Sequence, residues 1–147
     1  MHPTRLATPE TYLGLARAER FDPPPLQGTH TYAQPSKLAT SHFALAGTWE
    51  ESAVAATARA DAEIHGAILG KDAYLVLSPP RGATGEVRVL LDGRPIADDR
   101  AGADVHHGVV RVDRQRLYHL VSASTGEHHV LTLRVAPGVQ AYAFTFG

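Results

Sequence analysis

The fold class is decided by two C-terminal segments, Val130-Leu131-Thr132-Leu133-Arg134-Val135 and Val139-Gln140-Ala141-Tyr142-Ala143-Phe144-Thr145-Phe146. Large apolar side chains alternate in both segments with polar or small ones, the two-residue period of a β-strand with one buried face. We expect each segment to be a strand that turns one set of side chains to the core. The predicted inward-facing residues are Leu131, Leu133, Val135, Tyr142, Phe144 and Phe146.

Upstream of these segments, the chain repeats the same kind of pattern from about residue 37. Short apolar segments end at turn signals, and in the segment 85–91 residues Val87, Val89 and Leu91 point one way while Glu86 and Arg88 point the other. The Asp92-Gly93 pair that follows predicts a tight hairpin, because these residues tolerate the positive φ angles of a type I′ turn. Many short strands with almost no helical periodicity predict an all-β, antiparallel fold, a two-sheet sandwich or a barrel.

The first 36 residues have a different pattern and are interpreted as an N-terminal leader, with the β-sandwich domain spanning residues 37–147. Thr8 can cap a helix that has Pro9 at its first position, so the sequence predicts one short helix here. The Pro-rich segment 22–25 would end it.

Composition excludes several classes of function. The 147 residues carry a net charge of -1 and no polybasic stretch, which argues against binding to nucleic acid or to an anionic membrane surface. The absence of cysteine excludes disulfides, thiolate nucleophiles and thiolate metal ligands. No apolar run is long enough for a transmembrane helix or a secretory signal, so an extracytoplasmic location would depend on sequence outside this chain.

No pattern for catalysis, metal or cofactor binding emerges. There is no Gly-x-Ser-x-Gly nucleophile elbow and no glycine-rich phosphate loop. The nine histidines include the adjacent pairs 106–107 and 128–129, but neighbours on a strand point to opposite faces and rarely share a metal. We expect a non-catalytic domain with no catalytic residues, no metal site and no cofactor.

Four residues are candidates for ligand binding. Trp49 could stack on a sugar ring, although most tryptophans are largely buried in a core. Tyr118 with Arg116 could form a second platform, or simply a cross-strand packing pair. Arg88, beside Glu86, could hydrogen-bond a polyol, or belong to a solvated surface of alternating charges.

A further set of stretches is informative when taken in order along the chain. These stretches are Thr8–Gly14, His42–Trp49, Tyr74–Leu77, Arg88–Gly93, Arg116–Tyr118, Leu120–Val121 and Pro137–Gly147. Together they resemble the C-terminal domain of the DipZ-like proteins, which are thioredoxin-family, cytochrome c biogenesis-type thiol–disulfide proteins. The resemblance covers the chain from about Thr8 to Gly147.

The resemblance implies a jelly-roll β-sandwich, similar to carbohydrate-binding modules, that follows a membrane-embedded part and an extracytoplasmic thioredoxin-like domain. This chain departs from the full family because it has no Cys-x-x-Cys motif, so redox activity is not carried over to it. No functional residues of the sandwich are implied.

Two functions compete for such an accessory domain, and a small β-sandwich enzyme or metal-binding protein is a further alternative. One is recognition of a carbohydrate or other cell-envelope polymer, which an exposed aromatic on a concave sheet face would favour. The other is a structural or docking role toward the thioredoxin-like domain or its client protein. A flat apolar patch around Tyr12, Leu13 and Phe21 would favour docking.

Overall fold

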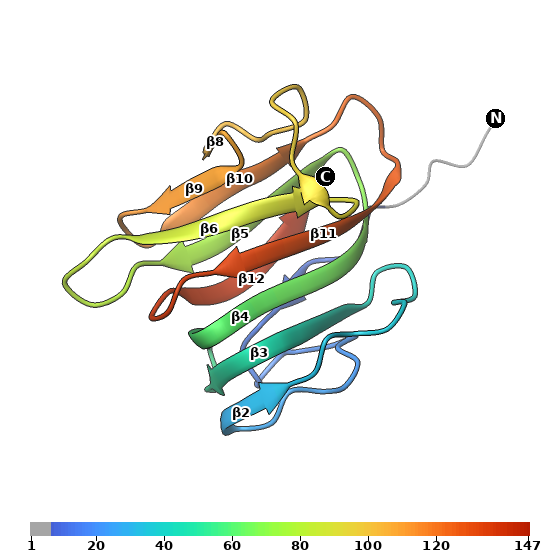
Figure 1. The fold of residues 1–147 in the computed structure, drawn as a ribbon. Coiled ribbons are helices and arrows are strands. Elements are labelled where there is room, and N and C mark those ends of the chain that lie inside the picture. Colours follow the sequence, from blue (N-terminus) through green and yellow to red (C-terminus); the bar gives the residue numbers. More distant parts are fainter. Residues whose placement is uncertain (1–6) are drawn as a thin grey trace.

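The computed structural model describes residues 7–147, and in this range it contains strands, turns and loops but no helix. The fold is all-β and antiparallel, as the alternating pattern predicts (Figure 1). The strands are β1 (Thr11–Tyr12), β2 (Gly28–Tyr32), β3 (Phe43–Glu51), β4 (Ala56–Leu69), β5 (Asp72–Ser78), β6 (Gly85–Leu91), β7 (Arg94–Pro95), β8 (Val105–His106), β9 (Val109–Val112), β10 (Arg116–Ser122), β11 (His128–Val135) and β12 (Gln140–Phe146).

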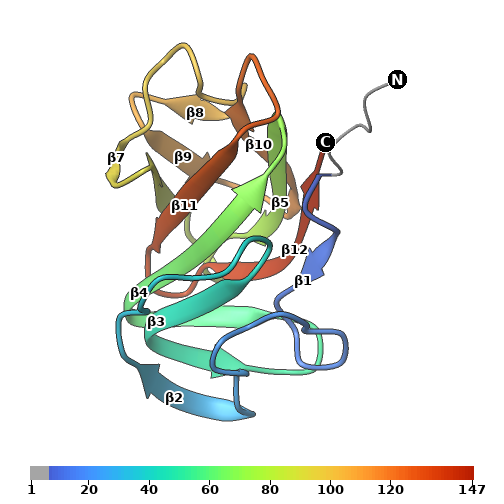
Figure 2. The same cartoon turned by 90° about the vertical axis from the view of Figure 1, so that its right-hand side faces the viewer.

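Hydrogen bonds join the strands in one continuous ladder in the order β10-β5-β12-β4-β11-β6-β9-β8. The short strands attach at its sides: β1 pairs with β12, β7 with β6, and β2 with β3, which itself pairs with β4. The ladder folds back on itself, so that β5, β10 and β12 lie behind β6, β9 and β11 (Figures 1 and 2). Two layers therefore face each other across the core.

The long strand β4 connects the two layers. Its first residues, Ala56 and Thr57, pair with β12, whereas the segment 62–69 pairs with β11. At the other side, the loop before β8 approaches β10, where the Gly102 amide donates to the Leu120 carbonyl at 3.0 Å. The predicted antiparallel layers are thus joined into one nearly closed sheet.

The core lies between the layers and contains most of the predicted inward-facing residues. Leu131, Leu133 and Val135 are buried on β11, and Val87, Val89 and Leu91 are buried on β6. Aromatic packing closes the opposite layer, where the ring of Phe144 stacks on those of Phe43 and Phe146 with centroids 5.4 Å apart in each pair.

The prediction for Tyr142 is wrong because β12 is irregular. The register against β5 shifts between Ala141 and Phe144, so that both of these residues are fully buried although they are three positions apart. Tyr142 is only half-buried, and its hydroxyl donates to Gln140 Oε1 at 2.7 Å. A bulge of this kind reverses the inward and outward sides of a strand.

The predicted N-terminal helix is also wrong. Thr8 bridges to β4 instead of capping a helix: its amide donates to the Leu69 carbonyl and its hydroxyl accepts from the Leu69 amide, both at 2.8 Å. Thr11 and Tyr12 then pair with β12 as β1. A short isolated helix is costly to nucleate, so backbone pairing with an existing strand is favoured over it.

The structure also describes the N-terminal leader and the predicted Asp92-Gly93 hairpin. The leader contributes β1 and β2 to the sheet, and its Leu13 and Phe21 side chains are buried in the core. The Asp92-Gly93 hairpin is confirmed, because both residues have positive φ angles, 53° and 81°, and Leu91 pairs with Arg94.

Candidate functional site

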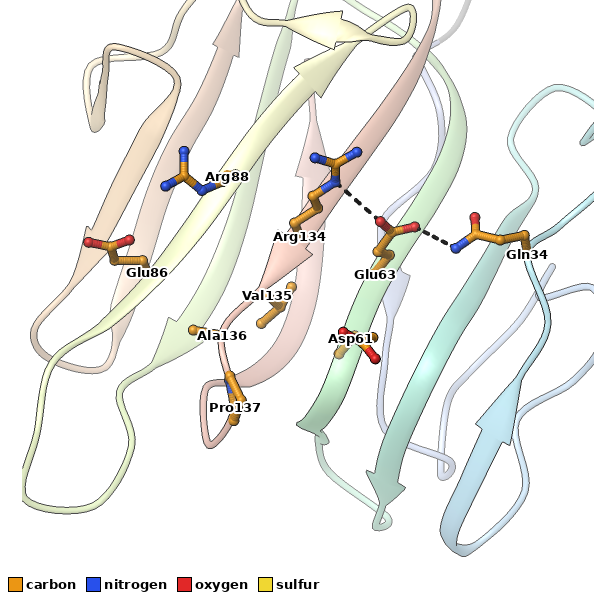
Figure 3. Close-up of a pocket in the computed structure, with 10 residues that line it drawn as sticks. Gln34, Asp61, Glu63, Glu86, Arg88, Arg134, Val135, Ala136 and Pro137 are labelled. Atoms are coloured by element: carbon orange, nitrogen blue, oxygen red, sulfur yellow. Dashed lines mark hydrogen bonds and ion pairs between the residues drawn. The ribbon is translucent and has the colours of Figure 1, made fainter.

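An open groove of about 570 Å³ lies on the outer face of β4, β6 and β11 (Figure 3). Six of the ten lining residues have polar or charged side chains, and no aromatic side chain is among the lining residues in the part of the chain that the structure describes. The residues that line it are Gln34, Asp61, Ala62, Glu63, Glu86, Arg88, Arg134, Val135, Ala136 and Pro137.

Strand register places the charged side chains of the groove in a row. Arg134 on β11 is the direct partner of Arg88 on β6 and of Glu63 on β4. The neighbouring positions along these strands, such as Val89 and Leu133, are buried, so alternation turns Arg88, Arg134 and Glu63 outward. The groove is therefore a direct product of the period-two pattern that builds the core.

Glu63 is the centre of a hydrogen-bond network at the wall of the groove. Its Oε1 accepts from Gln34 Nε2 at 2.9 Å and its Oε2 accepts from Arg134 Nε at 3.2 Å (Figure 3). Its Oε1 also accepts from His65 Nε2 at 2.9 Å. When the His65 ring is neutral, donation from Nε2 to this carboxylate leaves Nδ1 as the acceptor for the Thr132 hydroxyl, 3.4 Å away.

The same contacts decide the charge of Glu63. Partial burial works to raise its pKa, but the hydrogen bonds from Gln34 and His65, with the nearby charge of Arg134, outweigh burial and lower the pKa below its ordinary value. Glu63 is therefore ionised at neutral pH, and it holds the Arg134 side chain by the Nε atom alone.

Arg88 differs from Arg134 in having no carboxylate within ion-pair distance among residues 7–147. Its side chain is exposed, and Figure 3 shows its guanidinium on the same side of the strands as that of Arg134. Glu86, the acidic neighbour on β6, is the cross-strand partner of Arg111 on β9. The groove thus presents unused donors beside acceptors.

The two aromatic residues predicted to stack on a ligand lie inside the fold. Trp49 is fully buried and donates from Nε1 to the Ala46 carbonyl at 2.9 Å. Tyr118 is also fully buried, and its hydroxyl donates to the Arg114 carbonyl at 2.7 Å. Neither ring offers a face to a sugar in solution, which corrects the stacking role expected of them.

Arg116 lies away from the groove. Its guanidinium covers the Tyr118 ring at 3.8 Å from the centroid and pairs with Asp104 at 2.8 Å. The hydrogen bond from Arg116 lowers the pKa of Asp104 despite partial burial, and the His119 amide adds to this effect. Of the four predicted site residues, only Arg88 lines the groove; Trp49, Arg116 and Tyr118 are not brought to it.

The sequence prediction missed Arg134, Glu63, Gln34 and Asp61. A signal for Arg134 was present, since it is on the polar side of the alternating segment 130–135. Gln34 had none, because a loop outside the strand pattern brings its amide to Glu63.

Other predicted features have definite places in the described residues. The proposed apolar docking patch is not exposed, because Leu13 and Phe21 are 0% and 4% accessible. In residues 7–147 no group of His, Cys, Asp or Glu is arranged to hold a metal ion. The same part of the chain has no helix with the length and apolar character to cross a membrane.

The strand order defines an all-β, antiparallel class of domain, and its sequence contains no cysteine that could supply a thiol. More specifically, the chain belongs to the family described as the thioredoxin like C-terminal domain, whose model matches residues 8–147.

The relatives share sequence over nearly the whole of this chain. Protein DipZ of Mycobacterium bovis (strain ATCC BAA-935 / AF2122/97) and Protein DipZ of Mycobacterium tuberculosis (strain CDC 1551 / Oshkosh) are each 31% identical over 148 residues. The match covers 99% of this chain but 19% of either relative, so the chain spans about a fifth of their length.

Among solved structures, the chain has a partial likeness to a family two carbohydrate esterase from Clostridium thermocellum in complex with cellohexaose. The likeness has a TM-score of 0.48 with 20% sequence identity, and it covers 62% of this chain and 26% of the esterase chain.

Proposed function

We propose that this chain is a non-catalytic accessory domain that binds a saccharide of the cell envelope in the groove formed by β4, β6 and β11. The observation that supports this proposal is the open groove itself, where guanidinium, carboxylate and amide side chains converge on one exposed face. Binding sites usually combine such a concavity with a small number of oriented polar groups.

Hydrogen bonding supplies the recognition in this proposal, in place of aromatic stacking. Arg88 and Arg134 donate, Glu86 and Asp61 accept, and the Gln34 amide does both. Sugar hydroxyls exchange one hydrogen bond to water for another to protein, so each contact adds little net free energy. We expect weak binding, with a binding free energy on the order of -4 to -6 kcal/mol, which corresponds to dissociation constants nearer millimolar than nanomolar.

Family membership supports the wider context of the proposal. In a DipZ-like protein the accessory domain would sit outside the cytoplasmic membrane beside a thioredoxin-like domain. This chain has no cysteine, so the thiols for exchange would come from that neighbouring domain. Saccharide binding would then localise the redox domain at its envelope clients.

The test is isothermal titration of the intact chain with oligosaccharides released from envelope polymers. Gln34→Ala should weaken binding severalfold, since it removes a lining amide and one hydrogen bond to Glu63. Gln27→Ala is the matched control, because Gln27 is also exposed but is not among the lining residues. If no oligosaccharide binds, or if both variants weaken binding equally, the groove is not a saccharide site, and docking to a thioredoxin-like domain becomes the better account.

A further inference from the structure

Two arginines lie directly opposite each other in the groove, an arrangement that charge repulsion disfavours. Arg88 and Arg134 are cross-strand partners on β6 and β11, with their side chains on the same face. Like charges in this position destabilise a sheet. Within residues 7–147, no carboxylate forms an ion pair with Arg88, and the bond from Arg134 Nε to Glu63 is on the side of Arg134 that faces β4, away from Arg88.

The geometry leaves both guanidinium groups available to a ligand. Glu63 engages only Arg134 Nε, so the terminal Nη atoms of that side chain keep their donors. Gln34 and His65 fix the Glu63 carboxylate from its other oxygen, which holds the Arg134 side chain in place without using its fork. Arg88 has no ion-pair partner in the part of the chain described.

The two other carboxylates of the groove, Glu86 and Asp61, are not cross-strand partners of Arg88 or Arg134. Glu86 is opposite Arg111 on β9 rather than opposite Arg88. Asp61 lines the groove but is not a register partner of β11, whose pairing with β4 begins at Ala62. Two positive charges therefore border the space between the two arginines. Each guanidinium is planar and carries a fork of N–H donors, which suits the oxygens of a carboxylate or a phosphate.

We infer that the groove takes an anionic saccharide, whose carboxylate or phosphate group lies between Arg88 and Arg134. This inference rests on the proposed saccharide-binding function and names its ligand class. It also explains the opposed arginines, because an anion bound between them turns a repulsive pair into a site. Arg is suited to this role by its fork of donors, which a lysine does not provide.

The experiment is calorimetric titration of the intact chain with four probes. These are a galacturonic acid trisaccharide, the neutral galactose trisaccharide of equal length, a glycerol phosphate trimer and inorganic phosphate. We expect at least one acidic oligomer to bind about 10-fold or more tightly than the neutral trisaccharide, with an affinity that falls as salt is raised. The carboxylate and phosphate oligomers distinguish the two sources of the anion.

Variants separate binding from structure. Arg88→Ala and Arg134→Ala should each abolish the preference for the acidic probe, because they weaken its binding far more than that of the neutral trisaccharide, which loses only one hydrogen-bond donor. Arg88→Ala should also keep or raise the urea midpoint, because it relieves the repulsion. Arg88→Lys should retain the salt dependence but lose most of the preference. Arg81→Ala, an exposed arginine of the β5–β6 loop outside the lining residues, is the matched control and should change nothing.

The outcomes distinguish this inference from the function beneath it. If neutral and acidic trisaccharides bind equally, the ligand class is wrong while saccharide binding stands. If no oligosaccharide binds, both are overturned. Inorganic phosphate binding as tightly as the oligomers would mean a site for free anions and would also overturn the inference. A loss of stability in Arg88→Ala would mean that this arginine stabilises the fold, and it would overturn the inference that the opposed arginines are a binding site.

Discussion

Replacing Glu51 with glutamine should stabilise the protein increasingly as pH rises. Glu51, at the end of β3, is 3% exposed, and both of its carboxylate oxygens are buried without a hydrogen-bond partner in the described residues. Burial disfavours the charged form, and it raises the pKa of this carboxyl from 4.5 to about 8. Glu51 is therefore mostly protonated in the folded state at neutral pH.

The sign and size of the effect follow from linkage. Between pH 4.5 and about 8 the folded protein holds a proton that the unfolded chain has released, so the free energy of unfolding falls as pH rises through this window. Below it both states are protonated and nothing is lost. At about 1.4 kcal/mol for each unit of pKa, the loss at the alkaline end is on the order of 3 to 5 kcal/mol.

The assay is urea denaturation at pH 4, 6 and 8, followed by the fluorescence of the single, buried Trp49. Glu51→Gln should match the wild type at pH 4 and exceed it by a few kcal/mol at pH 8. Glu50→Gln is the control, since this neighbour is exposed and pairs with Arg59. A difference between Glu51→Gln and wild type that does not change with pH, or that favours the wild type at pH 8, would refute the reasoning.

Three further predictions concern packing, an ion pair and thiol chemistry. Phe144→Ala should cost about 3–5 kcal/mol in urea unfolding, because it removes a fully buried ring stacked on Phe43; a cost below about 0.5 kcal/mol would mean that the site is not packed. Asp104→Asn should cost about 1–3 kcal/mol at neutral pH by weakening the bond to Arg116, and the cost should vanish as pH falls through the lowered pKa of Asp104; a cost that persists in acid would contradict the pairing. The purified chain should not reduce insulin, because it has no thiolate; turnover free of contaminants would be inconsistent with this account.

The strands of the core were accessible to sequence reasoning because each is buried on one face only. Alternation alone predicted the inward side chains of β6 and β11, and the Asp92-Gly93 turn was recognisable from its residue types. Alternation failed at Tyr142, because the register shift in β12 depends on pairing with a distant strand and leaves no local pattern. The helix-capping signal failed at Thr8, because a local signal cannot show that Leu69 competes for the same backbone groups.

The groove was predictable only in part. Arg88 and Arg134 could be assigned to the polar side of their strands, but their direct opposition depends on the register between β6 and β11, which the sequence does not specify. Trp49 and Tyr118 were chosen for their chemistry, and whether an aromatic residue on a strand is buried depends on which layer covers it. Gln34 reaches Glu63 from a loop, and loop positions have no period to analyse.

Saccharide binding in the groove is the central claim, and an amide chemical-shift map of the isotopically labelled chain during titration with acidic and neutral envelope oligosaccharides tests it most directly. The account predicts that shifts concentrate at Arg88, Arg134, Glu63 and Gln34, and that Trp49 in the core is unaffected. Absence of any shift with every oligosaccharide, or shifts confined to the opposite layer of β5 and β10, would contradict it.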